Sequence, residues 1–106
     1  MQDECLLVIT SCPTHEVASD LAKLLVESRL AACAQISAPI TSIYEWEGEI
    51  CHEMEVTLQI KCLALNYSEI EAKIKQGHPY QVPEIIAVPI SHGLPEYLKW
   101  IRETSR

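Results

Sequence analysis

The stretch from residue 53 to residue 62 constrains the fold most, because its side chains alternate between polar and apolar. The apolar set is Met54, Val56, Leu58, Ile60 and Cys62, and the polar set is Glu53, Glu55, Thr57, Gln59 and Lys61. Successive side chains of a strand point to opposite faces, so this alternation predicts a strand with one face in the core. Such a strand needs neighbouring strands and a second layer over its apolar face.

Several other segments have the character of strands. Residues 5–12 and 84–90 are short apolar runs, typical of buried strands. Residues 31–47 also favour extended structure, with an interruption near Pro39. A glycine turn at 47–49 then leads into the alternating strand, which predicts a hairpin with long arms.

Three segments have the character of helices. Apolar residues recur at helical spacing over 15–28, and Thr14 before them is a suitable N-cap. A second helix opens at Asn66 and stops at Gly77, in the position of a C-cap glycine. Pro95 suits the first turn of a short terminal helix.

The order of these elements is strand, helix, strand, strand, helix, strand and a terminal helix. Two strand–helix–strand halves joined by a hairpin predict an α+β, ferredoxin-like sandwich (βαββαβ plus a C-terminal helix), with one antiparallel sheet and helices on one face. The chain has 106 residues, so we expect one domain spanning 1–106.

The predicted hairpin is too long for a subunit of this size. A compact chain of this length is about 33 Å across, whereas a strand over residues 31–46 would extend roughly 50 Å. Its tip carries Tyr44 and Trp46 on one face and Ile43 on the other. An isolated two-stranded ribbon is marginally stable and its edges invite pairing, so we expect a homo-oligomer built by strand pairing between subunits.

Composition narrows the classes of partner. The net charge of −7 and eight scattered basic residues argue against nucleic acid, which requires clustered Lys and Arg. No apolar run approaches the ~18 residues that span a bilayer and no leader opens the sequence, so we expect no membrane partner and a cytoplasmic location. The five cysteines are an odd number without a C-x-x-C pair, which favours buried thiols over disulfides.

The stretch GHPYQVPE at 77–84 is the first candidate site. His78 lies between a helix-ending glycine and Pro79, which favours extended backbone at His78 and a side chain reachable from solvent. An imidazole paired with a thiolate suits copper, while the alternative is a structural histidine in a turn.

Two other clusters are less favoured as metal sites. In CHEM at 51–54, strand alternation separates the potential ligands onto two faces, so we expect Met54 in the core and its neighbours on the surface. Five glutamates around the hairpin are spread along two strands and are expected to form a solvated face. They are Glu45, Glu47, Glu49, Glu53 and Glu55.

The motifs RLAACAQI, ITSIYEWEGEI, GHPYQVPEIIAVPISHG and YLKWI, in this order, closely resemble the CutA family of divalent-cation-tolerance proteins. The resemblance runs from about residue 6 to residue 104. It implies a ferredoxin-like subunit similar to the PII signalling proteins, assembled as a tight homotrimer. It also implies a role in tolerance of copper and other divalent metals.

The resemblance also points to metal ligands. The bacterial pattern associated with copper has a cysteine in the first strand and a His-His pair before Pro-Tyr. This chain has Thr10 and Gly77 at two of those positions and keeps His78. Cys12 lies two residues from Thr10, on the same face of a strand, and is the soft ligand expected to act with His78.

A second candidate site is a cleft between subunits. In a strand-paired trimer, Trp46, Lys61, Tyr80 and Glu84 can meet with His78 at the rim, a set suited to a small anionic or aromatic ligand. PII-like proteins bind nucleotides in such clefts, so a signalling trimer that binds a metabolite is the alternative to metal binding. A stable scaffold for protein interactions is a third interpretation. No catalytic motif is present, and we expect a binding protein, not an enzyme.

Overall fold

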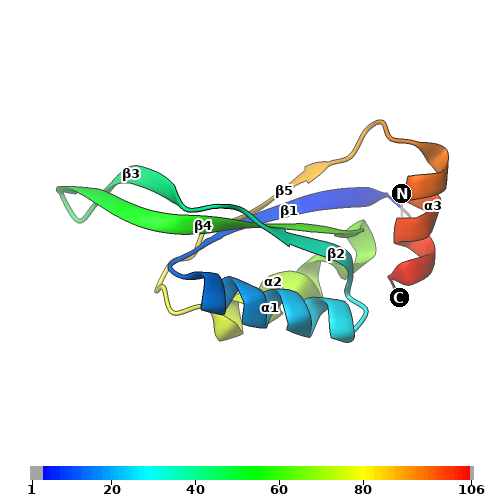
Figure 1. The fold of residues 1–106 in the computed structure, drawn as a ribbon, viewed down its shortest axis with the longest axis horizontal. Helices are drawn as coiled ribbons and strands as arrows, with labels where there is room; N and C mark the ends of the chain where they lie inside the picture. Colours follow the sequence, from blue (N-terminus) through cyan, green and yellow to red (C-terminus); the bar gives the residue numbers. More distant parts are fainter. Residues whose placement is uncertain (1–3, 106) are drawn as a thin grey trace.

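A computed structural model of the chain describes residues 4–105 and has the element order expected from the sequence. The strands are β1 (Cys5–Cys12), β2 (Ala31–Ile36), β3 (Ile40–Trp46), β4 (Glu49–Leu63) and β5 (Ile85–Pro89). The helices are α1 (His15–Glu27), α2 (Tyr67–Gly77) and α3 (Pro95–Thr104), with a 3-10 turn η1 (Ala64–Asn66) before α2. Figure 1 shows α1 and α2 on one face of the sheet and α3 at one end.

The sheet has the strand order of the predicted ferredoxin-like fold. Four strands lie in the order β2-β4-β1-β5, and β3 pairs with β4 outside this row. Every pairing is antiparallel. Because β4 lies between β1 and β2, and β1 between β4 and β5, each strand–helix–strand unit is split by a strand of the other. The predicted α+β class is confirmed.

The hydrophobic core lies between the sheet and the two helices α1 and α2. The apolar stripe of β4 is buried there from Val56 onwards, as the alternation predicted. The helices contribute the residues expected from their periodicity, among them Leu21 and Leu25 of α1 and Ile70 and Ile74 of α2. The core therefore uses one face of the sheet and leaves the other open.

The helix ends explain two of the local sequence signals. The Thr14 hydroxyl accepts a hydrogen bond from the Val17 amide at 3.2 Å, which confirms the predicted N-cap. Gly77 is the last residue of α2. A Cβ at this position would lie 3.0 Å from Leu21 Cδ2, so the glycine permits close packing against α1. The predicted end of the helix at Gly77 is confirmed, although the C-cap position itself is occupied by His78.

The last strand is less buried than the sequence indicated. β5 pairs only with β1 and forms an edge of the described sheet, where Pro89 is tolerated because no further strand there needs its amide. Ile86 and Val88 point to the open face and are about half exposed, whereas Ile85 and Ala87 pack on the core. The prediction of a buried strand is confirmed for one face of β5 and was wrong for the other.

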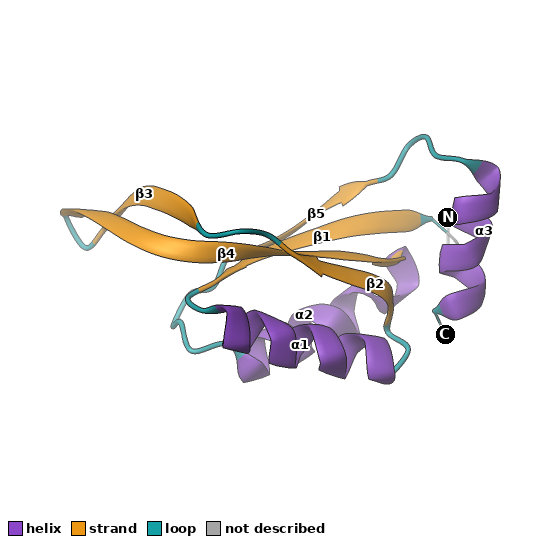
Figure 2. Ribbon diagram, viewed as in Figure 1, coloured by secondary structure: helices purple, strands orange, loops and turns teal. Residues whose placement is uncertain are grey.

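The hairpin of β3 and the first half of β4, residues 40–54, projects beyond the body of the subunit (Figure 2). The molecule measures 44 × 25 × 23 Å, longer than a compact chain of this length. The break near Pro39 is confirmed, because β2 ends at Ile36 and β3 begins at Ile40. Glu47 and Gly48, with φ of 52° and 83°, form the tight turn at its tip.

Met54 differs from its predicted place in the core. It lies on the same face of β4 as Val56 and Leu58, but its side chain is 62% exposed. The Thr41 hydroxyl donates a weak hydrogen bond to its sulfur at 3.5 Å. In Figure 1 the hairpin runs past the ends of α1 and α2, so neither of these helices covers Met54. The alternation identified the face correctly but not where the covering layer ends.

α3 packs at the end of the sheet opposite the hairpin (Figure 1). Ile101 is fully buried in a second small cluster with Cys5, Ala32 and Leu63. Among residues 4–105, no helix combines the length and the apolar character needed to span a bilayer.

Candidate functional site

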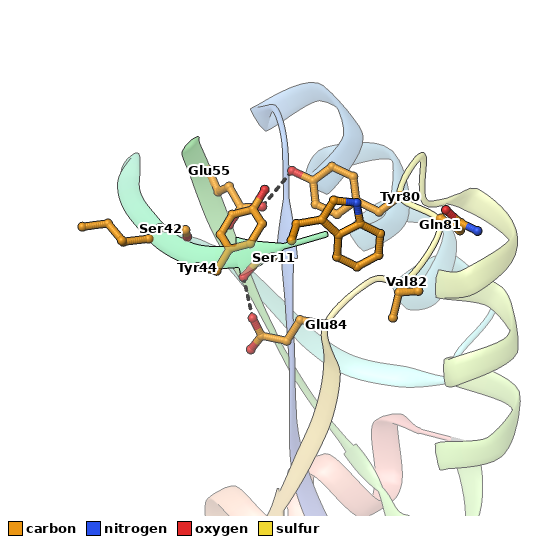
Figure 3. Close-up of a pocket in the computed structure, with 10 residues that line it drawn as sticks. Ser11, Ser42, Tyr44, Glu55, Tyr80, Gln81, Val82 and Glu84 are labelled. Atoms are coloured by element: carbon orange, nitrogen blue, oxygen red, sulfur yellow. Dashed lines mark hydrogen bonds between the residues drawn. The ribbon is translucent and has the colours of Figure 1, made fainter. Parts of the chain in front are cut away.

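A cavity of about 590 Å³ lies where the hairpin joins the body, between β1, the two hairpin strands and the 78–84 segment (Figure 3). This volume is in the range of small-molecule sites. Its polar lining is Ser11, Ser42, Glu55, Gln81 and Glu84, its aromatic lining is Tyr44, Trp46 and Tyr80, and its aliphatic lining is Ile43 and Val82. We call it the hairpin-base pocket.

Glu55 is the most buried of the lining residues, and it is hydrogen-bonded to Tyr80. The Tyr80 hydroxyl donates a 2.7 Å hydrogen bond to Glu55 Oε2, and Glu55 is only 6% exposed. Burying a carboxylate is costly without such a donor. Burial, followed by the hydrogen bond and the charge of Glu55, raises the pKa of Tyr80 above its usual 10.0, so the phenol stays protonated and can donate.

This burial corrects one expectation from the sequence. Glu55 was predicted to belong to a solvated acidic face. The segment after α2 folds over the end of the sheet and places Tyr80 against β4, which covers the carboxylate. Glu45, Glu47, Glu49 and Glu53 are exposed, as expected.

Glu84 is the second carboxylate of the pocket. Its Oε1 accepts a 3.0 Å hydrogen bond from the Ser11 hydroxyl at the end of β1, and the side chain remains exposed to solvent. Glu55 and Glu84 each use one oxygen in these contacts, and both side chains line the pocket. Figure 3 shows both hydrogen-bonded pairs beside Tyr44.

The electrostatic character of the pocket is negative. No Lys, Arg or His is among its lining residues, within the described part of the chain. Burial and the nearby charges of Glu53, Cys51 and Glu55 raise the pKa of Tyr44, which lines the pocket from β3. The aromatic and acidic side chains therefore provide a site for a positive group.

His78 holds the segment that carries Tyr80. It is 8% exposed, and its Nε2 donates to the Ser11 carbonyl at 2.7 Å, while its Nδ1 accepts from the Tyr80 amide at 3.2 Å. These partners require the neutral Nε2–H tautomer, since a carbonyl only accepts and an amide only donates. The rings of His78 and Tyr80 are 4.7 Å apart.

The expectation that His78 is reachable from solvent was wrong. Its backbone is extended, with φ −96° and ψ 135°, as Pro79 predicted. That conformation turns the ring towards β1, where both nitrogens are used. The arrangement matches the alternative interpretation, a structural histidine in a turn.

Cys12 lies on the core side of β1 and is fully buried. Burial, with a smaller effect from the charge of Glu55, raises its pKa from 9.0 to about 11. The thiol is therefore protonated near neutral pH, whereas a metal ligand must be a thiolate. Within residues 4–105, no group of three or more His, Cys, Asp or Glu side chains is placed to hold a metal ion.

Lys61 lies apart from the other three residues of the predicted cleft. Trp46, Tyr80 and Glu84 line one pocket of a single chain. Lys61 is six residues further along β4 than Glu55, about 20 Å away. Its ammonium donates to Gln35 Oε1 at 3.0 Å and to the Tyr97 hydroxyl at 3.3 Å, near α3. The described residues of this chain therefore place no lysine in the pocket.

Sequence reasoning missed Ser11, Tyr44 and Glu55 as partners in this pocket. The alternation of β4 did place Glu55 on the face opposite the core, and the pairing of Tyr44 with Cys51 puts Tyr44 on that same face. What no local pattern indicates is the path of residues 78–84, which closes the pocket over these strands.

Comparisons with known proteins match nearly the whole chain. The family model described as "CutA1 divalent ion tolerance protein" matches residues 6–104. The divalent-cation tolerance protein CutA of Thermus thermophilus is 44% identical over 99 residues, which are 93% of this chain and 96% of that protein. A CutA homolog of Xenopus laevis is 45% identical over 91 residues, 86% of this chain and 60% of that protein.

Solved structures give the same result. The crystal structure of the CutA1 protein from the psychrotrophic bacterium Shewanella sp. SIB1 has a TM-score of 0.94 at 46% identity, covering 99% of this chain and 98% of that one. The structure of the divalent cation tolerance protein from Thermus thermophilus has a TM-score of 0.93 at 43% identity, covering 96% of this chain and 99% of that one.

Proposed function

Because the chain belongs to the CutA1 divalent ion tolerance protein family, we propose that it acts in divalent-cation tolerance by binding a ligand as a homotrimer, without catalysing a reaction. The exposure of the hairpin is the main support for the proposed oligomer. Six of its large hydrophobic side chains are 39–66% exposed, namely Ile40, Ile43, Tyr44, Trp46, Ile50 and Met54.

The open face of the sheet supports the same proposal. Ile86 and Val88 are about half exposed there, and β5 leaves one strand edge unpaired among the described residues. Exposed apolar surface of this extent, combined with a free strand edge, marks an interaction surface. A second copy of the chain would cover both the hairpin and the open face. The number three is what the family resemblance implies.

Sedimentation equilibrium tests the assembly directly. We expect a mass about three times the 11.9 kDa of the chain at micromolar concentration. A mass of one chain under these conditions would refute the proposal, and a stable dimer would refute the trimer.

Within this broader role, copper coordination by Cys12 and His78 remains a prediction. Thiolate and imidazole are the ligands that copper prefers. Binding at this pair requires His78 to release the Ser11 carbonyl or the Tyr80 amide, and Cys12 to lose its proton. Metal affinity there should therefore increase with pH.

Calorimetric copper titration of wild type, His78→Ala and His15→Ala tests this pair. His15 is an exposed histidine in the first turn of α1 and serves as the matched control. Coordination by His78 predicts a lost binding event in His78→Ala alone. The same titration curve for all three proteins would rule out the His78 assignment while leaving the trimer proposal untouched.

A signalling trimer that binds a small molecule is the second candidate function. The hairpin-base pocket favours it, because a 590 Å³ cavity with three aromatic rings and two carboxylates is larger than a bare metal ion requires. A melting-temperature screen of small molecules checks this function, since a ligand that binds only the folded state must raise the midpoint.

A further inference from the structure

The charges that this chain contributes to the hairpin-base pocket disfavour one class of ligand. Its two carboxylates, Glu55 and Glu84, face a cavity whose lining includes no Lys, Arg or His, as far as residues 4–105 are concerned. A nucleotide or another anion would meet like charges without a counterion, which is unfavourable. The net charge of −7 of the whole chain, which includes these two carboxylates, also favours a cationic ligand.

The aromatic lining argues against a bare metal ion as the best ligand. Hard divalent cations require about six oxygen ligands, and no cluster of three metal-binding side chains exists among the described residues. Tyr44, Trp46 and Tyr80 instead line the cavity with aromatic rings. Aromatic rings attract organic cations, and indole does so best.

The apolar lining of the pocket favours a ligand that has an apolar part beside its charged group. Val82 lines the cavity and is about two-thirds exposed in the single chain, whereas Ile43 pairs with His52 and so lies on the opposite face of the hairpin from Tyr44 and Trp46. Val82 and the aromatic rings offer apolar surface to a ligand stem, and the carboxylates of Glu55 and Glu84 line the same cavity. Carboxylates form their strongest hydrogen bonds with charged N–H donors.

We propose that the hairpin-base pocket binds a small organic ammonium ion carried on an apolar or aromatic stem. The ammonium donates to Glu84 and Glu55, and the stem packs between Trp46, Tyr44 and Val82. This inference rests on the second candidate function and names the class of its ligand. It differs from the small anionic or aromatic ligand that the sequence predicted, because Lys61 of the same chain lies at the other end of β4.

Three probes of nearly the same shape test the charge requirement: benzylammonium, benzyl alcohol and benzoate. Each is titrated at neutral pH into the purified, assembled protein, with the melting temperature and the calorimetric Kd as readouts. We expect benzylammonium to raise the melting temperature with increasing concentration. We expect benzyl alcohol to bind at least about tenfold more weakly and benzoate not to bind. Equal binding of the three, or preference for benzoate, would overturn the inference.

Two variants that each remove one negative charge test whether the ammonium binds in the hairpin-base pocket. Glu84→Gln keeps the size of the side chain and is expected to weaken benzylammonium at least about tenfold, with little effect on benzyl alcohol. Glu45→Gln is the matched control, because Glu45 pairs with Ile50 on the other face of the hairpin and does not line the pocket. Equal effects of the two variants would overturn the location, and if Glu84→Gln fails to fold, the wild-type probe series decides.

A titration with metal salts distinguishes failure of this inference from failure of the proposed role in divalent-cation tolerance. ZnCl₂ and CuCl₂ alone are titrated into the same protein. If the metals bind with loss in Glu84→Gln while benzylammonium does not, the ammonium inference fails and a role in divalent-cation tolerance stands. If neither metal nor any probe binds, the inference fails, and so does a single-subunit ligand site at this pocket. Sedimentation of the protein is independent of both results and tests the trimer.

Discussion

The two halves of β4 show the same sequence pattern in two different environments. From Val56 to Cys62 the apolar side chains are at most 5% exposed, because α1 and α2 cover them. On the same face, Met54 and Ile50 are 62% and 66% exposed, because the strand has passed the helices. Alternation therefore encodes which face of the strand is apolar, whereas burial depends on how far the covering layer of helices reaches.

The hairpin-base pocket lies at the boundary between these two regions. Its carboxylates come from the body, from β4 and from the segment just before β5, and two of its aromatic rings come from the hairpin strand β3. Any movement of the hairpin relative to the body would change the pocket. Binding there is therefore expected to be coupled to whatever covers the hairpin.

The largest loss of stability is expected from a substitution in the part of β4 that the helices cover, compared with one in the hairpin. Leu58→Ala should lower the free energy of unfolding by about 3 kcal/mol, because it leaves a cavity in the core. Met54→Ala, on the same face, should cost less, because no helix of the same chain covers Met54. Urea unfolding curves of both variants check this. Equal losses would mean that a neighbouring subunit buries Met54 as fully as the helices bury Leu58.

The second prediction concerns how the free energy of unfolding depends on pH through a buried thiol of the body. Burial raises the pKa of Cys12 from 9.0 to about 11, so the protonated thiol stabilises the folded state fully below pH 9. That contribution is lost as the pH rises from 9.0 to about 11, because the unfolded chain then ionises first. We expect the alkaline loss of the wild type to exceed that of Cys12→Ala by about 3 kcal/mol.

Urea unfolding at a series of pH values measures this loss. Cys51→Ala, on the hairpin, is the control and should keep the wild-type pH dependence. A Cys12→Ala variant with the same alkaline loss as wild type would contradict the assignment to Cys12.

The third effect tests the hairpin as an interaction surface. Ile50→Glu places a charge on its exposed apolar face and should weaken self-association at least about tenfold, or about 1.4 kcal/mol. Leu24→Glu is the control, because Leu24 is exposed on α1, on the covered side of the sheet. Sedimentation over a range of concentrations gives the dissociation constant for self-association of each variant. Equal weakening by the two variants would show that the contact does not centre on the hairpin.

The smallest effect lies at the hairpin tip. Gly48 has φ 83° and open space around its Cβ position, so Gly48→Ala meets a backbone cost only, about 1 kcal/mol. Glu47→Gly should instead be neutral or slightly stabilising, since Glu47 also has positive φ. Melting temperatures of the two variants check this. An unchanged Gly48→Ala would mean that the tight turn is not maintained in solution.

Much of the fold followed from local patterns in the sequence. The alternation of β4, the helical spacing after Thr14 and the break near Pro39 each depend on neighbouring residues, and the structure confirms them. Their order then left few arrangements of one sheet and two helices. The length of the hairpin was enough to predict that it projects from the body, as it does.

The candidate site was predicted less completely, because its parts lie far apart in the sequence. Trp46, Tyr80 and Glu84 were singled out and do line one pocket. Glu55 was assigned to solvent and His78 to an accessible position, and both are buried. The reason is the same for both: residues 78–84 cross the end of the sheet, so Tyr80 reaches Glu55 and His78 reaches Ser11.

By itself, the sequence determined the elements, their order and the face that each strand presents to the core, since these depend on residues within a few positions of one another. Only the tertiary structure decided what covers each face. It buried Leu58 but not Met54, paired Glu55 with Tyr80, and separated Lys61 from the pocket. These outcomes depend on where distant segments meet, because burial and charge pairing are properties of the packed chain and not of local periodicity.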